Sequence, residues 1–64
     1  MTLGQKIKKI RKNMGLSQEV LGEILCVSRQ TITKWETDTG IPDINNLQEI
    51  SKLFGFPIDY FLND

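Results

Sequence analysis

The shortest connection in this chain is the pair Cys26–Val27, which separates two segments with a helical pattern. Ser17 precedes the first segment, where Leu21 and Leu25 lie four residues apart and therefore on one side of a helix. Ser28 precedes the second segment. Serine is favoured just before a helix because its hydroxyl accepts a hydrogen bond from a free backbone N–H of the first turn. The sequence therefore predicts two short helices joined by a very tight turn.

One further helix is predicted before this pair. Thr2 and Gln5 form a capping-box pattern, in which each side chain satisfies a free backbone N–H group of the other residue. Gly15 is expected to end this helix in the left-handed conformation. The apolar residues recur at spacings of three and four, which predicts one shared helical face, and they are Leu3, Ile7, Ile10 and Met14.

Two more helices are predicted after the pair. Asp43 is the expected cap of a helix that Gly55 ends, and Pro57 fits the first turn of a short fifth helix. The apolar stripes of these helices comprise Ile44, Leu47, Ile50, Leu53 and Phe54, then Ile58, Phe61 and Leu62. No segment alternates with a period of two over a useful length. We therefore expect one all-α domain over residues 1–64, built as a compact five-helix bundle.

The composition excludes several classes of function. Cys26 is the only cysteine and histidine is absent, which leaves almost no ligands for a metal site. Serines without any histidine to act as a base make an enzyme very improbable, and we infer no cofactor and no small-molecule ligand. There is no apolar run near 18 residues, so no membrane span is expected. The lysines near the N-terminus lack the apolar stretch of a secretory signal, and the expected compartment is the cytoplasm.

A formal net charge of zero hides an uneven distribution of charge. Residues 1–18 contain no acid and five basic residues, namely Lys6, Lys8, Lys9, Arg11 and Lys12. This asymmetry indicates either a polyanionic partner for one side of the molecule or an ordinary solvated helix face. Charge alone favours the solvated face.

Residues 28–36 carry an unusual concentration of hydrogen-bonding side chains. At about 100° per residue, Ile32 and Trp35 point to one side of a helix. The other side carries no carboxylate, and its side chains are Arg29, Gln30, Thr33 and Lys34. Arginine pairs with guanine, glutamine with adenine, and a threonine methyl packs on thymine in the DNA major groove. On this segment alone, a base-reading face and an ordinary solvated face are equally supported.

The ordered motifs resemble one known family. The stretches LSQEVLGEILCVSRQTITKWE and PDINNLQEISKLFGFPIDYFL are similar to the phage-repressor (Cro/XRE-type) helix-turn-helix family, and the match covers about Leu3 to Leu62. The resemblance implies a five-helix fold with a helix-turn-helix at the second and third helices. It also implies a sequence-specific DNA-binding transcriptional regulator of bacterial or phage origin, commonly a repressor. Such a protein reads double-stranded DNA with residues about 28–36 and usually acts as a homodimer.

The resemblance also assigns roles to individual positions. It implies that bases are read by Arg29, Gln30, Thr33 and Lys34. The implied phosphate contacts are Gln18, which also braces the reading helix, Thr31, and a loop offering backbone N–H groups at Thr37, Thr39 and Gly40. Arg11 and Glu36 correspond to a partly buried structural ion pair, which removes Arg11 from the DNA contacts. The C-terminal segment is rich in apolar residues, of which some are expected to cover the core and the rest to form a dimer contact, and the candidates for that contact are Phe56, Tyr60, Phe61 and Leu62.

Some positions depart from the family pattern. Gly22 stands where alanine is usual, and either residue is expected to leave room for the next helix. Cys26 stands where glycine is favoured, so the turn is either strained or shaped differently, and Asp38 is expected to repel phosphate. Val20 and Ile24 form either an enlarged core edge, the favoured interpretation, or an exposed apolar strip. The alternative function is a protein-interaction module of the same fold, such as an antitoxin or a regulatory partner.

Overall fold

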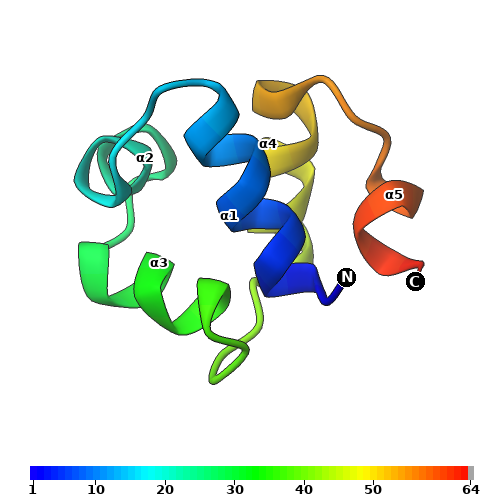
Figure 1. Cartoon of the computed structure of the whole chain (residues 1–64), viewed down its shortest axis with the longest axis horizontal. Coiled ribbons are helices and arrows are strands. Elements are labelled where there is room, and N and C mark those ends of the chain that lie inside the picture. The colour runs from blue at the N-terminus through cyan, green and yellow to red at the C-terminus, as the bar shows by residue number, and fades with distance from the viewer. Residues whose placement is uncertain (64) are drawn as a thin grey trace.

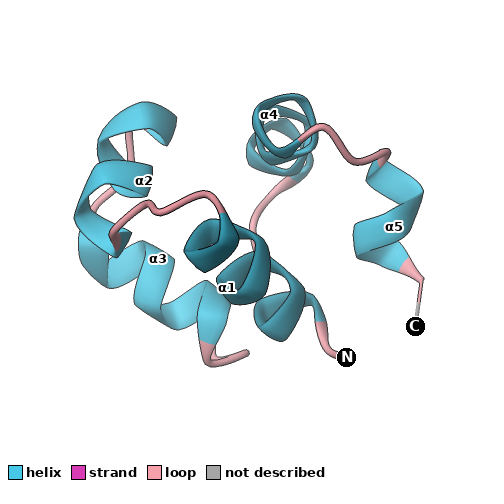
Figure 2. Cartoon of the chain, turned by 45° about the horizontal axis from the view of Figure 1, so that its top comes forward, coloured by secondary structure: helices cyan, strands magenta, loops and turns pink. Residues whose placement is uncertain are grey.

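The computed structural model describes residues 1–63, and within them the chain folds into five α-helices. They are α1 (Leu3–Asn13), α2 (Gln18–Leu25), α3 (Arg29–Glu36), α4 (Ile44–Phe54) and α5 (Ile58–Leu62). In Figure 1 the α2–α3 pair lies to the left of α1 and α5 to the right; in the turned view of Figure 2, α4 lies above α1, and it packs against both α2 and α5. The predicted all-α class is confirmed for residues 1–63, and none of the helices in this range is long and apolar enough to cross a membrane.

The helix caps explain where the elements begin. The Thr2 hydroxyl accepts the Gln5 N–H at 3.1 Å, and the Gln5 side-chain oxygen accepts the Thr2 N–H at 2.9 Å. The other predicted caps also accept a backbone N–H from the first turn, and they are Ser17, Ser28 and Asp43. The prediction for the last helix was wrong by one position, because Pro57 precedes α5 as its N-cap instead of lying in its first turn. The predicted caps of α1 to α4 are confirmed.

The hydrophobic core lies between α1 and the other four helices. Its buried side chains are Ile7, Ile10, Leu21, Leu25, Ile32, Trp35, Leu47, Ile50, Phe54 and Phe61. The predicted apolar stripes were too long at their ends, because Met14, Ile44 and Leu62 are exposed and do not belong to this core. These three residues lie at or just beyond the terminal turn of a helix, where no neighbouring helix covers them.

The turn between α2 and α3 depends on close backbone contact. Cys26 ends α2 in the left-handed conformation, with φ 59° and ψ 39°, and the following Val27 N–H donates to the Gly22 carbonyl at 2.9 Å. The turn therefore has the left-handed shape that glycine favours, and of the two alternatives the strained one holds, because a Cβ is disfavoured in this conformation. A Cβ added to Gly22 would lie 2.7 Å from the Val27 carbonyl oxygen. The expectation that alanine at position 22 also leaves room for α3 was therefore wrong, because the Val27 carbonyl occupies the space that its Cβ needs.

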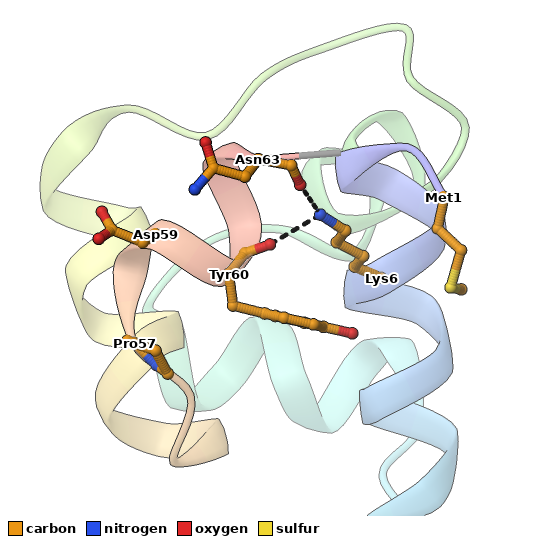
Figure 3. A pocket seen from close by; sticks show the side chains of 6 residues that line it. All are labelled: Met1, Lys6, Pro57, Asp59, Tyr60 and Asn63. Carbon is orange, nitrogen blue, oxygen red and sulfur yellow. Dashed lines mark hydrogen bonds between the residues drawn. The ribbon is translucent and has the colours of Figure 1, made fainter.

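The last helix is held by a lysine from α1. Lys6 is only 6% exposed, and its Nζ donates to the Tyr60 carbonyl at 2.7 Å and also to the Asn63 carbonyl (Figure 3). The same nitrogen lies 5.0 Å from the centre of the Tyr60 ring, within cation–π range. These residues line a surface hollow of about 400 Å³ beside α5, on the opposite side of α1 from α3. Lys6 therefore belongs to the interior and is not part of a basic surface.

Candidate nucleic-acid interface

The third helix presents the side chains that the sequence singled out. Ser28 caps α3, and Ile32 and Trp35 anchor its inner face in the core. The predicted base-reading residues lie on the other face, where all are exposed, and they are Arg29, Gln30, Thr33 and Lys34. An α-helix with its side chains is about 10–12 Å across, which matches the width of the DNA major groove. The outer face of α3 is therefore shaped and equipped to enter that groove.

A buried ion pair fixes α3 to α1. Arg11 Nε lies 2.6 Å from Glu36 Oε2, Arg11 Nη2 donates to Glu36 Oε1 at 3.1 Å, and both side chains are buried. Arg11 Nη1 also donates to the Leu16 carbonyl at 2.8 Å, just before α2 begins. A guanidinium paired through two nitrogens with a carboxylate has a defined orientation. One side chain thus sets the position of the end of α3 and of the entry to α2.

Gln18 connects this ion pair to the exposed face of α3. Its amide nitrogen donates to Glu36 Oε1 at 3.0 Å. Its carbonyl oxygen accepts the Thr33 hydroxyl at 3.2 Å and the Arg29 Nε–H at 3.5 Å. A continuous chain of hydrogen bonds therefore runs from the buried Arg11 to the exposed Arg29.

A polar hollow opens where the starts of α2 and α3 meet. It has a volume of about 430 Å³ and is lined by Arg11, Ser17, Gln18, Glu19 and Arg29. The first backbone N–H groups of α2 and the Arg29 guanidinium make this region favourable for an anion, while the Glu19 carboxylate opposes one. Thr31, the other predicted phosphate contact in α3, is half-buried and its hydroxyl lies 3.0 Å from that of Ser28.

The loop after α3 does not offer the backbone groups that were expected. The N–H of Thr37 donates to the Thr33 carbonyl at 3.0 Å, and those of Thr39 and Gly40 donate to the Lys34 carbonyl at 2.9 and 3.1 Å. These groups close the C-terminal end of α3 and are not free for phosphate, so the predicted backbone contacts were wrong. The Thr37 and Thr39 side chains are exposed, but their hydroxyls donate to the same end of α3, to the Thr33 carbonyl at 2.8 Å and to the Lys34 carbonyl at 3.3 Å.

Asp38 has a structural role that the sequence did not show. Its backbone has φ 61°, and its two carboxylate oxygens accept the Gly4 N–H at 3.0 Å and the Thr2 hydroxyl at 2.7 Å. A negative charge at the N-terminus of α1 is favoured by the helix dipole. Asp38 therefore supports the N-terminus of α1 through both of its carboxylate oxygens.

The apolar residues proposed for contacts with partners differ in how much of each side chain is exposed. Phe61 is only 3% exposed and lies 6.3 Å from Phe54, ring centre to ring centre, so its assignment to a dimer contact was wrong. Phe56 and Leu62 are exposed, and Tyr60 is half-buried. Val20 and Ile24 are 39% and 46% exposed. The favoured interpretation of these two as a core edge was wrong, because no element within residues 1–63 covers the outer face of α2.

The burial of Lys6 escaped sequence reasoning although a signal was present. Lys6 lies three residues after Leu3 and four before Ile10, which places it within the apolar stripe of α1. Its position therefore indicated an inward side chain, while its charge indicated an outward one. Asp38 carried no comparable signal, because its partners lie 34 and 36 residues away in the sequence.

The fold and this interface together define a helix-turn-helix protein, and comparison with known families agrees. The model of the helix-turn-helix family matches residues 7–61, so the chain belongs to that family, and the resemblance inferred from its motifs is confirmed. The chain is 41% identical to the HTH-type transcriptional activator BcrR of Enterococcus faecalis over 63 aligned residues. This alignment covers 98% of this chain and 31% of BcrR.

Solved structures share the fold closely. The c2 repressor of Salmonella phage P22, in complex with a synthetic operator, has a TM-score of 0.89 at 31% identity, covering 95% of this chain and 92% of that one. A second structure is that of SinR of Bacillus subtilis, a master regulator for biofilm formation, in complex with DNA. It has a TM-score of 0.85 at 27% identity, and the alignment covers 97% of this chain and 100% of the SinR chain. The chain spans less than half the length of the first curated relatives that it matches, with shares of 31% to 45%.

Proposed function

We propose that this chain is a sequence-specific DNA-binding transcriptional regulator, of the repressor kind, that reads the major groove with α3. The observation that carries the proposal is the exposed edge of α3, which holds Arg29 and Gln30 at its first turn and contains no acid. Arg29 donates to guanine O6 and N7, and Gln30 pairs with adenine N6 and N7. Thr33 and Lys34 extend the same edge by one turn and contact the next bases.

The proposed phosphate contacts are made by the first residues of α2 and by the threonines around α3. Gln18 and Glu19, the first residues of α2, line the polar hollow together with Arg29, and a helix N-terminus favours a phosphate. Thr31, Thr37 and Thr39 carry hydroxyls beside α3, and those of Thr37 and Thr39 must release the Thr33 and Lys34 carbonyls before they donate to a phosphate. These contacts position the helix on the backbone of the duplex, and the bases then determine which sequence binds well.

The comparisons support DNA as the partner. The P22 c2 repressor binds a synthetic operator and SinR binds DNA, and both align with more than nine-tenths of this chain. A regulator of this kind works in the bacterial cytoplasm, where the chromosome lies. The family consists of DNA-binding regulators and not of enzymes.

Two copies of the chain are needed for strong binding. The formal net charge is zero, and the buried Lys6 and Arg11 do not reach phosphates, so one copy attracts DNA weakly. A homodimer that contacts itself through Phe56, Tyr60 and Leu62 presents two α3 helices to half-sites about 10 bp, or roughly 34 Å, apart. Each phosphate neutralised adds about 0.9 to the log–log salt slope, so a modest slope is expected.

Replacement of Arg29 by alanine tests the base-reading role. We expect the Arg29→Ala variant to lose about 1–3 kcal/mol of discrimination at a single base pair in each half-site, with an unchanged thermal midpoint. Gel shifts with a set of single-substitution duplexes measure this loss. Lys52→Ala is the matched control, because it removes the same charge from an exposed position on α4 and leaves α3 unchanged. An equal loss of affinity on every duplex would exclude base reading by Arg29.

A protein-interaction module is the second candidate function, and the exposed Val20–Ile24 strip on α2 is the observation that favours it. In that case the chain binds a protein partner tightly through α2 and shows no DNA binding at low salt. The same gel shifts, repeated at low ionic strength, separate the two functions.

A further inference from the structure

We propose that Asp38 is a positioning residue for base recognition, which fixes the loop of residues 37–40 against α1 and thereby holds Lys34 at the reading face. This inference rests on the proposed function and deepens it, because it adds a residue that contacts no base to those that determine sequence preference. Asp38 follows α3 by two residues and carries a charge that repels phosphate, so its place there requires a reason other than DNA contact.

The start of α1 lies directly against the end of α3, as both views of the fold show (Figure 1 and Figure 2). Gly4 is buried there, and a Cβ added to it would lie 2.3 Å from the Trp35 carbonyl oxygen and 2.7 Å from Asp38 Oδ1. A residue with a Cβ therefore has no room at position 4. This close approach brings the first N–H groups of α1 within hydrogen-bond distance of the loop.

Asp38 contacts the start of α1 with both carboxylate oxygens. Its Oδ1 accepts the Gly4 N–H at 3.0 Å, and its Oδ2 accepts the Thr2 hydroxyl at 2.7 Å. The Thr2 oxygen accepts the Gln5 N–H at 3.1 Å, which leaves its single proton for Asp38. Asp38 reaches these groups with φ 61°, a conformation that is disfavoured for a residue with a Cβ. Two charge-assisted hydrogen bonds offset that cost.

Asp38 and Glu36 together attach the end of α3 to α1 at two points. Glu36 pairs with Arg11, and Asp38 accepts from Gly4, which lies seven residues earlier in α1. At about 1.5 Å per residue, the two anchor points on α1 are roughly 10 Å apart. The ion pair alone leaves the loop free to pivot about one point, whereas two contacts at this separation fix its direction. Asp38 therefore restrains the loop in a way that Glu36 does not.

The restrained loop packs on Lys34. The Lys34 carbonyl accepts the N–H groups of Thr39 at 2.9 Å and of Gly40 at 3.1 Å, and the Asp38 N–H donates to the next carbonyl, that of Trp35, at 3.2 Å. A Cβ added to Gly40 would lie only 3.2 Å from the Lys34 Cβ, so the loop borders the base of the lysine side chain. The loop therefore limits the directions in which this side chain leaves α3.

This restraint matters because a lysine side chain is flexible. An ammonium on a four-carbon stem reaches phosphates as well as bases, and a phosphate contact carries no sequence information. Confinement of the stem by the loop keeps the ammonium near the edges of the bases, where guanine O6 and N7 are its acceptors. Asp38 thus acts on sequence preference through Lys34 and not through its own charge.

Two substitutions at this one position separate the hydrogen bonds of Asp38 from its charge. Asp38→Gly keeps the left-handed conformation and removes both contacts with α1. Asp38→Asn also tolerates that conformation, and its amide can still accept the Gly4 N–H and donate to the Thr2 hydroxyl. Both variants lose the same negative charge, so any general gain in affinity for DNA is common to them. A difference between them reports the contacts with α1 alone.

The base pair contacted by Lys34 is the one whose preference Lys34→Ala abolishes. We expect Asp38→Gly to lower discrimination at this base pair roughly 2–10-fold and to retain discrimination at the base pair read by Arg29. Asp38→Asn should keep both preferences. In the Lys34→Ala background, Asp38→Gly should cause no further loss. Gel shifts with single-substitution duplexes measure these preferences, at a temperature where circular dichroism shows that each variant is folded.

Several results would overturn the inference. Wild-type discrimination in a folded Asp38→Gly protein would show that Lys34 does not need the loop contact. An equal loss in Asp38→Asn would assign the effect to charge, and a loss that persists without Lys34, or that is equal at every base pair, would place it elsewhere. Unchanged preferences in Lys34→Ala would remove Lys34 as a reader. A wild-type protein that binds all duplexes alike would instead remove the proposed function, so the two failures are distinguishable.

Thr2→Val provides a second test that does not depend on the folding of Asp38→Gly. It removes the hydroxyl that donates to Asp38 Oδ2 and preserves the contact with the Gly4 N–H. We expect a smaller loss of discrimination at the same base pair. Full retention of discrimination by Thr2→Val would contradict the inference.

Discussion

Two buried cations leave α1 in different directions, and they hold the two sides of the molecule in different ways. Arg11 pairs through two nitrogens with the Glu36 carboxylate and continues through Gln18 to the exposed face of α3. Lys6 meets no carboxylate among its partners and donates to the carbonyls of Tyr60 and Asn63 at the end of α5. The guanidinium fixes an orientation, while the ammonium neutralises the negative end of a short helix.

Because Arg11 and Lys6 have different partners, one cation of α1 is connected to the DNA-reading face and the other only to the stability of the fold. The contacts of Arg11 extend to Gln18 and Arg29, so a change there disturbs both folding and the reading face. The contacts of Lys6 end at backbone oxygens on the opposite side of α1 (Figure 3). Changes at the two positions are therefore expected to affect stability in both cases but DNA selection only in the first.

The largest expected effect is that of Arg11→Ala. Removal of one partner leaves the Glu36 charge buried and unpaired, which costs about 3–5 kcal/mol of unfolding free energy. Thermal or denaturant unfolding followed by circular dichroism measures the loss. Lys12→Ala is the control, since it removes a cation from the exposed neighbouring position. A melting curve for Arg11→Ala like that of the wild type would mean that the ion pair does not hold α3.

The next effect in size is that of Lys6→Met. Methionine keeps the length and apolar character of the stem, but it leaves the Tyr60 and Asn63 carbonyls without their donor. We expect a loss of about 1–3 kcal/mol, the cost of unpaired buried polar groups, and faster amide hydrogen exchange in α5. DNA discrimination should not change. Altered discrimination with α5 still protected would contradict the separation of the two sides.

The smallest effect tests the turn on the Arg11 side. Cys26 adopts φ 59°, where a Cβ costs roughly 1–2 kcal/mol, whereas glycine adds unfolded-state entropy worth about 0.4–1 kcal/mol. Cys26→Gly should therefore stabilise the fold by about 0–1.6 kcal/mol, while Cys26→Ala, which keeps the Cβ, should not. Calorimetry of the two variants measures the difference. A less stable glycine variant would show that the thiol makes a favourable contribution.

Local chemistry made most of the fold predictable. Capping residues such as Ser17 and Ser28 act on backbone groups within three residues, so their effect can be recognised from the sequence alone. The face of α3 was predictable for the same reason, because Ile32 and Trp35 define its inner side through helical spacing. Family resemblance supplied the pairing of Arg11 with Glu36, which no spacing argument reaches.

The missed features depend on partners far away along the chain. The charge of Lys6 indicated a surface side chain, but its partners are the carbonyls of Tyr60 and Asn63, which lie 54 and 57 residues further along the chain. The sequence placed Asp38 in a loop with no expected partner, and the structure shows that its carboxylate accepts the Gly4 N–H at the start of α1. Phe61 and Ile24 both lie in amphipathic helices, and only the packing of the other helices buries the first and leaves the second exposed. Periodicity gives the direction of a side chain but not what lies opposite it.

Selection of binding sites from a random duplex library is the most direct test of the claim that α3 reads DNA. The account predicts an enriched motif of two related half-sites about 10 bp apart, with one position that loses its guanine preference when Arg29 is replaced by alanine. A selection at low salt that enriches no motif, or a motif unchanged by Arg29→Ala, would contradict it.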